Sequence, residues 1–148
     1  MGEVVGAGIV SHVPTIMLPE ETRRELNGGK EISIVPGFHR LRDEVLDVLE
    51  PDTFIVFDTH CATLLEFFVP AHERRSGKFT SEELPNGMRQ VPYDMKGSPE
   101  LAQLMADAIN AEGVRSSTVD DPYLPIHYGT VNVAHYLNRG EEWLSIGV

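Results

Sequence analysis

The stretch Thr53-Phe54-Ile55-Val56-Phe57-Asp58-Thr59-His60 decides the fold of this 148-residue chain. Its first five residues are β-branched or aromatic, which is typical of a buried strand. Pro51-Asp52 comes directly before it and ends a helical pattern, because proline cannot continue a helix. We therefore expect a strand from Thr53 to Phe57 that delivers Asp58 and His60 to its carboxyl end.

Helical and strand-like patterns alternate on both sides of this stretch. Periodic apolar residues predict helices at about 37–50, 98–113 and 130–137, and the charged segment 19–30 predicts a surface helical turn and loop. Apolar runs predict strands at 3–10, 114–119 and 142–148, and mixed signals predict a hairpin-rich segment within 64–96. The alternation indicates an α/β fold with a largely parallel, mixed sheet flanked by helices.

The length suits one compact domain over residues 1–148. However, Trp143 to Val148 is an apolar run that continues to the last residue, so we also expect the chain to be the N-terminal part of a larger catalytic domain. If that run is a central strand, the free chain leaves a sheet edge uncovered. We therefore expect a homo-oligomer or association with a complementary chain.

Charge and composition exclude several classes of protein. Lys and Arg number 12 against 23 Asp and Glu, a net charge of −11, and no basic block offsets it. A nucleic-acid or membrane partner is therefore not expected. The single cysteine, Cys61, cannot form an internal disulfide, which favours a reducing cytoplasm.

Three of the six histidines, His12, His60 and His127, lie just after or between predicted strands. Neutral imidazole is the commonest protein ligand of iron, zinc and copper. Ligands of parallel sheets bind beyond the carboxyl ends of the strands, so His12 and His60 can converge on one metal, with Asp58 as a further ligand or as an acceptor for an imidazole N–H. The alternative is that each histidine packs locally and bonds a backbone carbonyl.

The remaining chemistry-bearing residues favour ordinary roles. His39 and His135 are expected to be helix-surface or partly buried residues, His72 to be solvated in a charged loop, and Cys61 to be a small buried hydrophobe rather than a reactive thiol. Tyr123 and Tyr128 flank His127 and either line a pocket for a flat ring or simply pack. No nucleotide-binding glycine loop, nucleophile elbow or HExxH zinc motif occurs in the sequence.

Several motifs together carry a resemblance to a known family. They are Gly8-Ile9-Val10-Ser11-His12-Val13-Pro14, Thr53 to His60, Ser81 to Pro85, Gly97 to Leu101, Glu112-Gly113-Val114 and Ile126-His127-Tyr128-Gly129-Thr130. The chain resembles the class III extradiol ring-cleavage dioxygenases over essentially its whole length. Within them it is most similar to the 3,4-dihydroxyphenylacetate (homoprotocatechuate) 2,3-dioxygenase branch.

The resemblance implies a mononuclear non-haem Fe(II) held by two histidines and one carboxylate. His12 and His60 match the two imidazole ligands, and His127 matches a position beside the metal that assists proton transfer or holds the catechol. The family's glutamate ligand and main acid/base histidine lie in a C-terminal half that this sequence does not contain. The resemblance thus implies that these groups come from beyond Val148 or from a partner chain.

The expected function is cleavage of a small aromatic diol by O2, beside the diol, to give a muconic semialdehyde. Two histidines and a carboxylate occupy one face of an octahedral iron and leave the other face for the catechol oxygens and O2. Two alternatives remain open at this stage. One is a non-catalytic subunit or binding module with an incomplete metal site, and the other is a zinc-dependent hydrolase that uses the same histidines.

Overall fold

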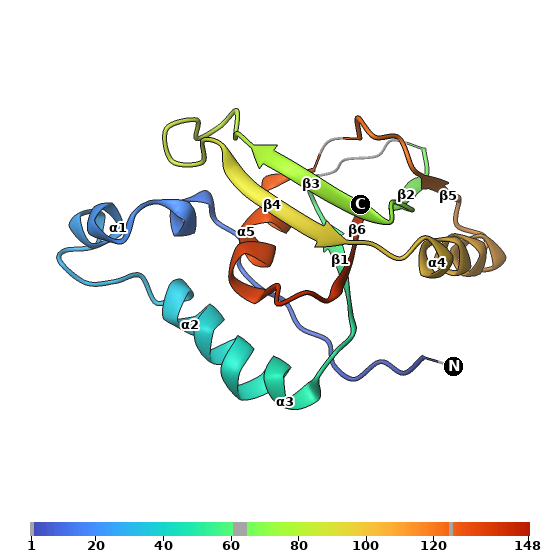
Figure 1. Cartoon of the computed structure of the whole chain (residues 1–148), viewed down its shortest axis with the longest axis horizontal. Helices are drawn as coiled ribbons and strands as arrows, with labels where there is room; N and C mark the ends of the chain where they lie inside the picture. The colour runs from blue at the N-terminus through green and yellow to red at the C-terminus, as the bar shows by residue number, and fades with distance from the viewer. Residues whose placement is uncertain (1, 61–64, 125) are drawn as a thin grey trace.

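A four-stranded mixed sheet forms the centre of the chain in the computed structural model, which describes residues 2–60, 65–124 and 126–148 (Figure 1). The strand order is β1 (Thr53–Asp58), β6 (Glu142–Gly147), β4 (Val91–Lys96) and β3 (Arg74–Phe79). β6 runs parallel to both of its neighbours, whereas β3 and β4 form an antiparallel hairpin. β2 (Phe67–Pro70) and β5 (Ser116–Val119) make a separate parallel pair. The predicted α/β class and the hairpin are confirmed.

The helices also lie close to their predicted positions. The short helices η1 (Pro14–Met17) and α1 (Glu20–Leu26) precede a continuous helical stretch of α2 (Ile34–Leu41), the π-helical turn η2 (Arg42–Leu46) and α3 (Asp47–Leu49). This stretch begins earlier than the pattern predicts, and it ends at Glu50, whose φ of 48° is left-handed. Later in the chain follow α4 (Pro99–Ala111) and α5 (Tyr128–Leu137).

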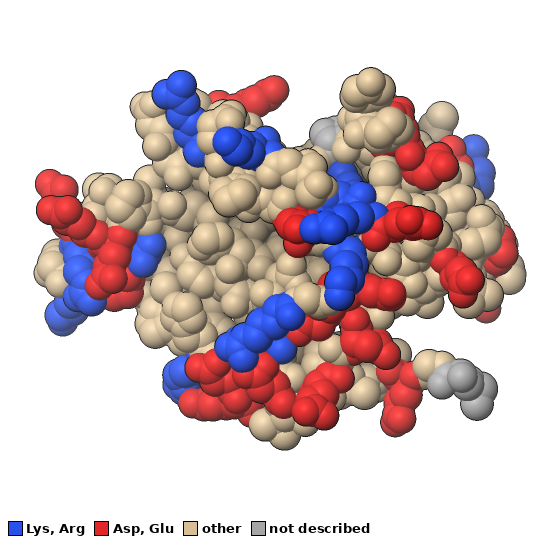
Figure 2. Space-filling view, viewed as in Figure 1, with Lys and Arg blue, Asp and Glu red and all other residues tan. Residues whose placement is uncertain are grey.

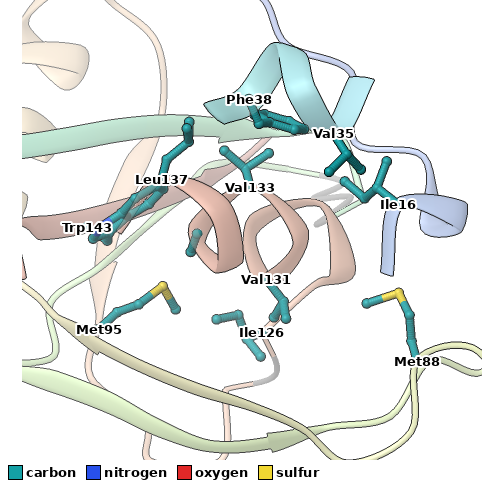
Figure 3. Close-up of a cluster of buried hydrophobic side chains, with 11 residues drawn as sticks. Ile16, Val35, Phe38, Met88, Met95, Ile126, Val131, Val133, Leu137 and Trp143 are labelled. Atoms are coloured by element: carbon teal, nitrogen blue, oxygen red, sulfur yellow. The ribbon is translucent and has the colours of Figure 1, made fainter. Parts of the chain in front are cut away.

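α5 is the buried centre of the larger hydrophobic core. It packs between the sheet and the helices η1 and α2, so its side chains are buried nearly all round, as Figure 3 shows for Val131, Val133 and Leu137. Trp143 of β6 and Phe38 of α2 contribute large side chains to the same cluster. The position of α5 matters for function because its N-terminal end meets the carboxyl end of β1.

The opposite face of the sheet carries a second, smaller core. Successive side chains of a strand point to opposite faces, so Trp143 faces α5 whereas Leu144 and Ile146 pack with Ala102 and Ala106 of α4. β6 is thus covered on both faces, as expected for an inner strand of a parallel sheet.

The predicted strand at residues 3–10 is wrong. The segment is extended but forms no strand, and Val4 and Ile9 are 84% and 102% exposed. A strand needs the backbone of a neighbouring strand to satisfy its amide and carbonyl groups, and this segment pairs with none in the described parts of the chain. The prediction of a buried strand used only the apolar character of the side chains. That character does not show whether a neighbouring strand is present.

Among the described residues, no strand pairs with the outer edge of β1. Ile55 and Phe57 on this strand are 44% and 63% exposed. The run at Trp143 to Val148 itself forms most of the inner strand β6, and the association of chains stays a prediction. On the face drawn in Figure 2, acidic side chains gather along the lower edge over α2 and α3 with basic ones among them. No helix in the described ranges is long and apolar enough to cross a membrane.

Candidate functional site

His60 lies in the turn that follows β1, as the sequence predicts. Asp58, the last residue of β1, is 4% exposed, and its Oδ1 accepts the backbone N–H of His60 at 2.9 Å. The same oxygen lies 3.3 Å from Nδ1 of the His60 ring, close enough for a charge contact but without hydrogen-bond geometry. Asp58 therefore shapes the turn that carries His60 and faces one edge of its ring.

A buried chain of hydroxyl groups holds Asp58 in place. Its Oδ2 accepts hydrogen bonds from the backbone N–H of Thr130 at 2.9 Å and from the Thr130 hydroxyl at 2.6 Å. Since that hydroxyl has one proton, Ser145 of β6 donates to it in turn, at 2.7 Å. Burial opposes ionisation of Asp58, but these bonds outweigh it and lower its pKa, so the carboxylate form is favoured.

Tyr128 occupies the other edge of the His60 ring. Its hydroxyl lies 2.5 Å from Nε2 of His60, and the two ring centroids are 4.1 Å apart. Because Nδ1 faces the Asp58 carboxylate, the favourable neutral tautomer carries its proton on Nδ1, and Nε2 then accepts from the phenol. Burial raises the pKa of the Tyr128 phenol, and Glu83 and Asp58 raise it further, so the phenol keeps the proton that it donates.

His12 lies beside His60, as predicted, but it is not held at the end of a strand. It does not follow a strand, yet its ring centroid lies 4.7 Å from that of His60 and 5.7 Å from that of Tyr128. The carbonyl of His12 accepts a 2.8 Å hydrogen bond from Nδ2 of Asn132, a fully buried residue of α5. The predicted meeting of His12 and His60 is thus present, although the predicted reason for it is wrong.

His127 comes directly before α5 and is half-buried. Burial is the main cause that lowers its pKa, and the positive charge of Arg75 and the neighbouring His60 lower it further, whereas Asp58 raises it. At neutral pH the ring is therefore neutral and able to accept a proton. No hydrogen bond or ring contact within the described residues joins the His127 side chain to His12 or His60, so its place in the site stays a prediction.

Other residues considered from the sequence lie elsewhere. Tyr123 is 90% exposed, and His39 and His135 are exposed on helices, as expected for the two histidines. The prediction that His72 is solvated is wrong, because its ring is half-buried and its Nε2 bonds the carbonyl of Asp121 at 2.8 Å, which links two loops. Cys61 lies outside the described residues.

The residues present fit two of the three protein ligands that the resemblance implies. The His12 and His60 rings lie edge to face with centroids 4.7 Å apart, and the Asp58 carboxylate lies beside Nδ1 of His60, as is usual for the ring nitrogen of a metal-binding histidine that does not bind the metal. Within residues 2–60, 65–124 and 126–148, no group of three or more His, Cys, Asp or Glu side chains is arranged to hold a metal ion. Asp58 is not a third ligand here, because its oxygens are taken by Thr130 and His60.

Sequence reasoning missed Thr130, Ser145 and Asn132 as supports of the site. Asn132 had a signal, because it is a polar residue inside the apolar run Val131 to Ala134. Thr130 and Ser145 had none, since a hydroxyl side chain near a helix start or within a strand is ordinary. Only the packing of α5 against β1 and β6 shows what these two hydroxyls contact.

Comparisons with known proteins now bear on this site. The model of the catalytic LigB subunit of aromatic ring-opening dioxygenases matches residues 6–139, a range that contains His12, His60 and His127. The chain belongs to this family. It is also 32% identical over 155 aligned residues to 3,4-dihydroxyphenylacetate 2,3-dioxygenase of Escherichia coli, an alignment that covers 100% of this chain and 52% of that enzyme. The predicted family is confirmed, and the chain spans about half the length of this relative.

Proposed function

We propose that this chain supplies two histidine ligands to an Fe(II)-dependent extradiol dioxygenase, which opens the ring of a catechol such as 3,4-dihydroxyphenylacetate with O2. The observation that carries this proposal is the close approach of His12 and His60, with ring centroids 4.7 Å apart, in a chain of the LigB family. The substrate class follows from the relative's name and from nothing else in the chain. The remaining ligand, a carboxylate, is expected from outside residues 1–148 or from a partner chain.

His12 and His60 are the residues that would hold the iron, and Asp58, whose Oδ1 lies 3.3 Å from Nδ1 of His60, favours the tautomer that leaves Nε2 for the ion. When bound, Fe(II) would act as a Lewis acid that lowers the pKa of a catechol hydroxyl, and it would supply the redox chemistry that allows O2 to react with the ring. With His12, His60 and a carboxylate from outside residues 1–148 as its ligands, the ion would keep positions open for substrate.

His127 is the residue of this chain best suited to accept a catechol proton. Its lowered pKa keeps the imidazole neutral at neutral pH, which is the form that a general base requires. Its half-buried position before α5 limits competition from bulk water. The principal acid/base group of the family's reaction is expected outside this chain, so His127 would assist rather than replace it.

The test begins with the complete protein from its natural source, loaded anaerobically with Fe(II). Addition of 3,4-dihydroxyphenylacetate and air should give the yellow ring-fission product. His12→Ala and His60→Ala should each abolish product formation, whereas His39→Ala, which alters an exposed histidine on α2, should leave the rate unchanged. Failure to open any of several catechols would contradict the proposal.

The same experiment separates a complete enzyme from a subunit. If product forms only after a complementary chain is added back, the chain is one part of a two-chain dioxygenase. If either histidine variant keeps full activity, the proposed ligand assignment is wrong, whatever the substrate proves to be.

A further inference from the structure

The starting observation is that the only accessible ring nitrogen of His60 is already engaged. Nδ1 is buried and faces the Asp58 carboxylate, so it does not offer a lone pair to an incoming ion. Nε2 bonds the Tyr128 hydroxyl at 2.5 Å, and the centroid of the His12 ring lies 4.7 Å from that of the His60 ring. A metal ion that binds His60 must therefore bind Nε2, and it cannot do so while the phenol donates to the same lone pair.

The backbone of Tyr128 is not free to move away. Gly129 lies against Asp58, since a Cβ atom at this position would come within 3.1 Å of Oδ1, and Thr130 bonds Asp58 through both its amide and its hydroxyl. The first turn of α5 is thus fixed to the end of β1. Rotation of the Tyr128 side chain releases Nε2 without disturbing this backbone.

We propose that the Tyr128 hydroxyl and the metal ion compete for Nε2 of His60, so that Tyr128 holds the ring ready in the metal-free protein and is displaced when the ion binds. Tyr128 is then a positioning residue that acts through His60. In the metal-free protein it satisfies a nitrogen that otherwise lacks a partner in the described parts of the chain. The proposal rests on the metal-binding part of the proposed function and not on ring cleavage.

This competition has an unusual consequence for mutation. A residue that only supported the site would weaken metal binding when altered. Tyr128→Phe instead removes a hydrogen bond that the metal has to break, while the ring contacts with His60 and His12 remain. A single hydrogen bond of this kind corresponds to roughly a three- to tenfold gain in metal affinity.

The experiment is a titration of the metal-stripped complete protein with Co(II). Calorimetry and the visible spectrum of the bound ion measure the binding. Tyr128→Phe should bind Co(II) roughly three- to tenfold more tightly than the original protein. Tyr123→Phe, which removes the hydroxyl of an exposed tyrosine, should bind with unchanged affinity, and His60→Ala should lose most of the binding. Circular dichroism should show the same fold in all four proteins.

Three outcomes would overturn the inference. Unchanged affinity in Tyr128→Phe would mean that the phenol does not compete, and weaker affinity would mean that it helps to bind the metal. In both cases the proposed metal site itself would stand, because the original protein still binds Co(II). Absence of Co(II) binding by the original protein would instead contradict the metal-binding part of the proposed function, and this inference with it.

Discussion

The two histidines of the candidate site are held in opposite ways. His60 lies in the turn directly after β1, and the buried residues Asp58 and Thr130 tie this turn to α5. His12 ends an extended segment whose side chains are largely exposed, and a hydrogen bond from Asn132 to its carbonyl anchors it. One half of the site is thus built into the sheet, whereas the other half is attached to α5 through the backbone.

This difference shows which part of the site is preorganised. The His60 ring is hydrogen-bonded through Nε2 to Tyr128 and has the Asp58 carboxylate 3.3 Å from Nδ1, so few alternative orientations are open to it. The His12 side depends on how well the segment before it is held. Disturbing the sheet should therefore affect stability strongly, whereas disturbing the segment should affect mainly the site.

The largest contrast is expected between two isoleucines. Ile146 in β6 is fully buried, and Ile146→Ala should lower the free energy of unfolding by about 2–5 kcal/mol through the cavity that it leaves. Ile9 in the N-terminal segment is fully exposed, and Ile9→Ala should change the free energy of unfolding by less than about 0.5 kcal/mol. Urea unfolding followed by circular dichroism measures both values. A large loss in Ile9→Ala would mean that the segment is packed in solution.

The next largest effect on stability is expected from the buried carboxylate of Asp58. Asp58→Asn keeps the shape of the side chain but presents an amide to donors from Thr130 and His60, so unfolding should become easier by about 2 kcal/mol. Asp52→Asn, which changes an exposed residue just before β1, is the matched control and should have little effect. Equal midpoints in urea for the two variants would show that the Asp58 network does not stabilise the fold.

Asn132, which holds the N-terminal segment, should contribute less to stability than Asp58, and its loss should make the segment easier to cleave. Asn132→Ala removes the bond to the His12 carbonyl and should lower the free energy of unfolding by about 1 kcal/mol. It should also speed native-state proteolysis within residues 2–13, because nothing else described bonds the carbonyl of His12. Asn86→Ala, at an exposed loop position, is the control. Unchanged cleavage in Asn132→Ala would show that α5 does not hold the segment.

The smallest effect concerns the ion pair just after the segment. Arg23 binds Glu31 through two hydrogen bonds of 2.8 and 2.7 Å, which lower the pKa of Glu31 to about 2. A lowered folded-state pKa gives stability that is present above the unfolded value of about 4.3 and is lost as the pH falls toward 2. The difference in urea midpoint between the original protein and Glu31→Gln should therefore shrink over this range. A constant difference would contradict the assigned pKa.

Much of the architecture could be predicted because local patterns determine it. The β-branched run at Thr53 to Phe57 and the periodic helix at Leu101 to Ile109 each carry their own signal, and both lie where expected. The strand at residues 3–10 failed because a strand also needs a neighbour, which its own residues do not reveal. The histidine pair could be predicted from the sequence, whereas the Asp58–Thr130–Ser145 chain depends on contacts between segments far apart in it.

The central claim, that His12 and His60 together bind one metal ion, has a direct test in the metal content of the purified protein. The complete protein should be reconstituted anaerobically with Fe(II), freed of excess metal, and analysed for iron per chain beside His12→Ala, His60→Ala and the exposed control His39→Ala. The account predicts near-stoichiometric iron in the original protein and in His39→Ala, and loss of most iron in the other two. Full iron content in His12→Ala and His60→Ala would contradict it.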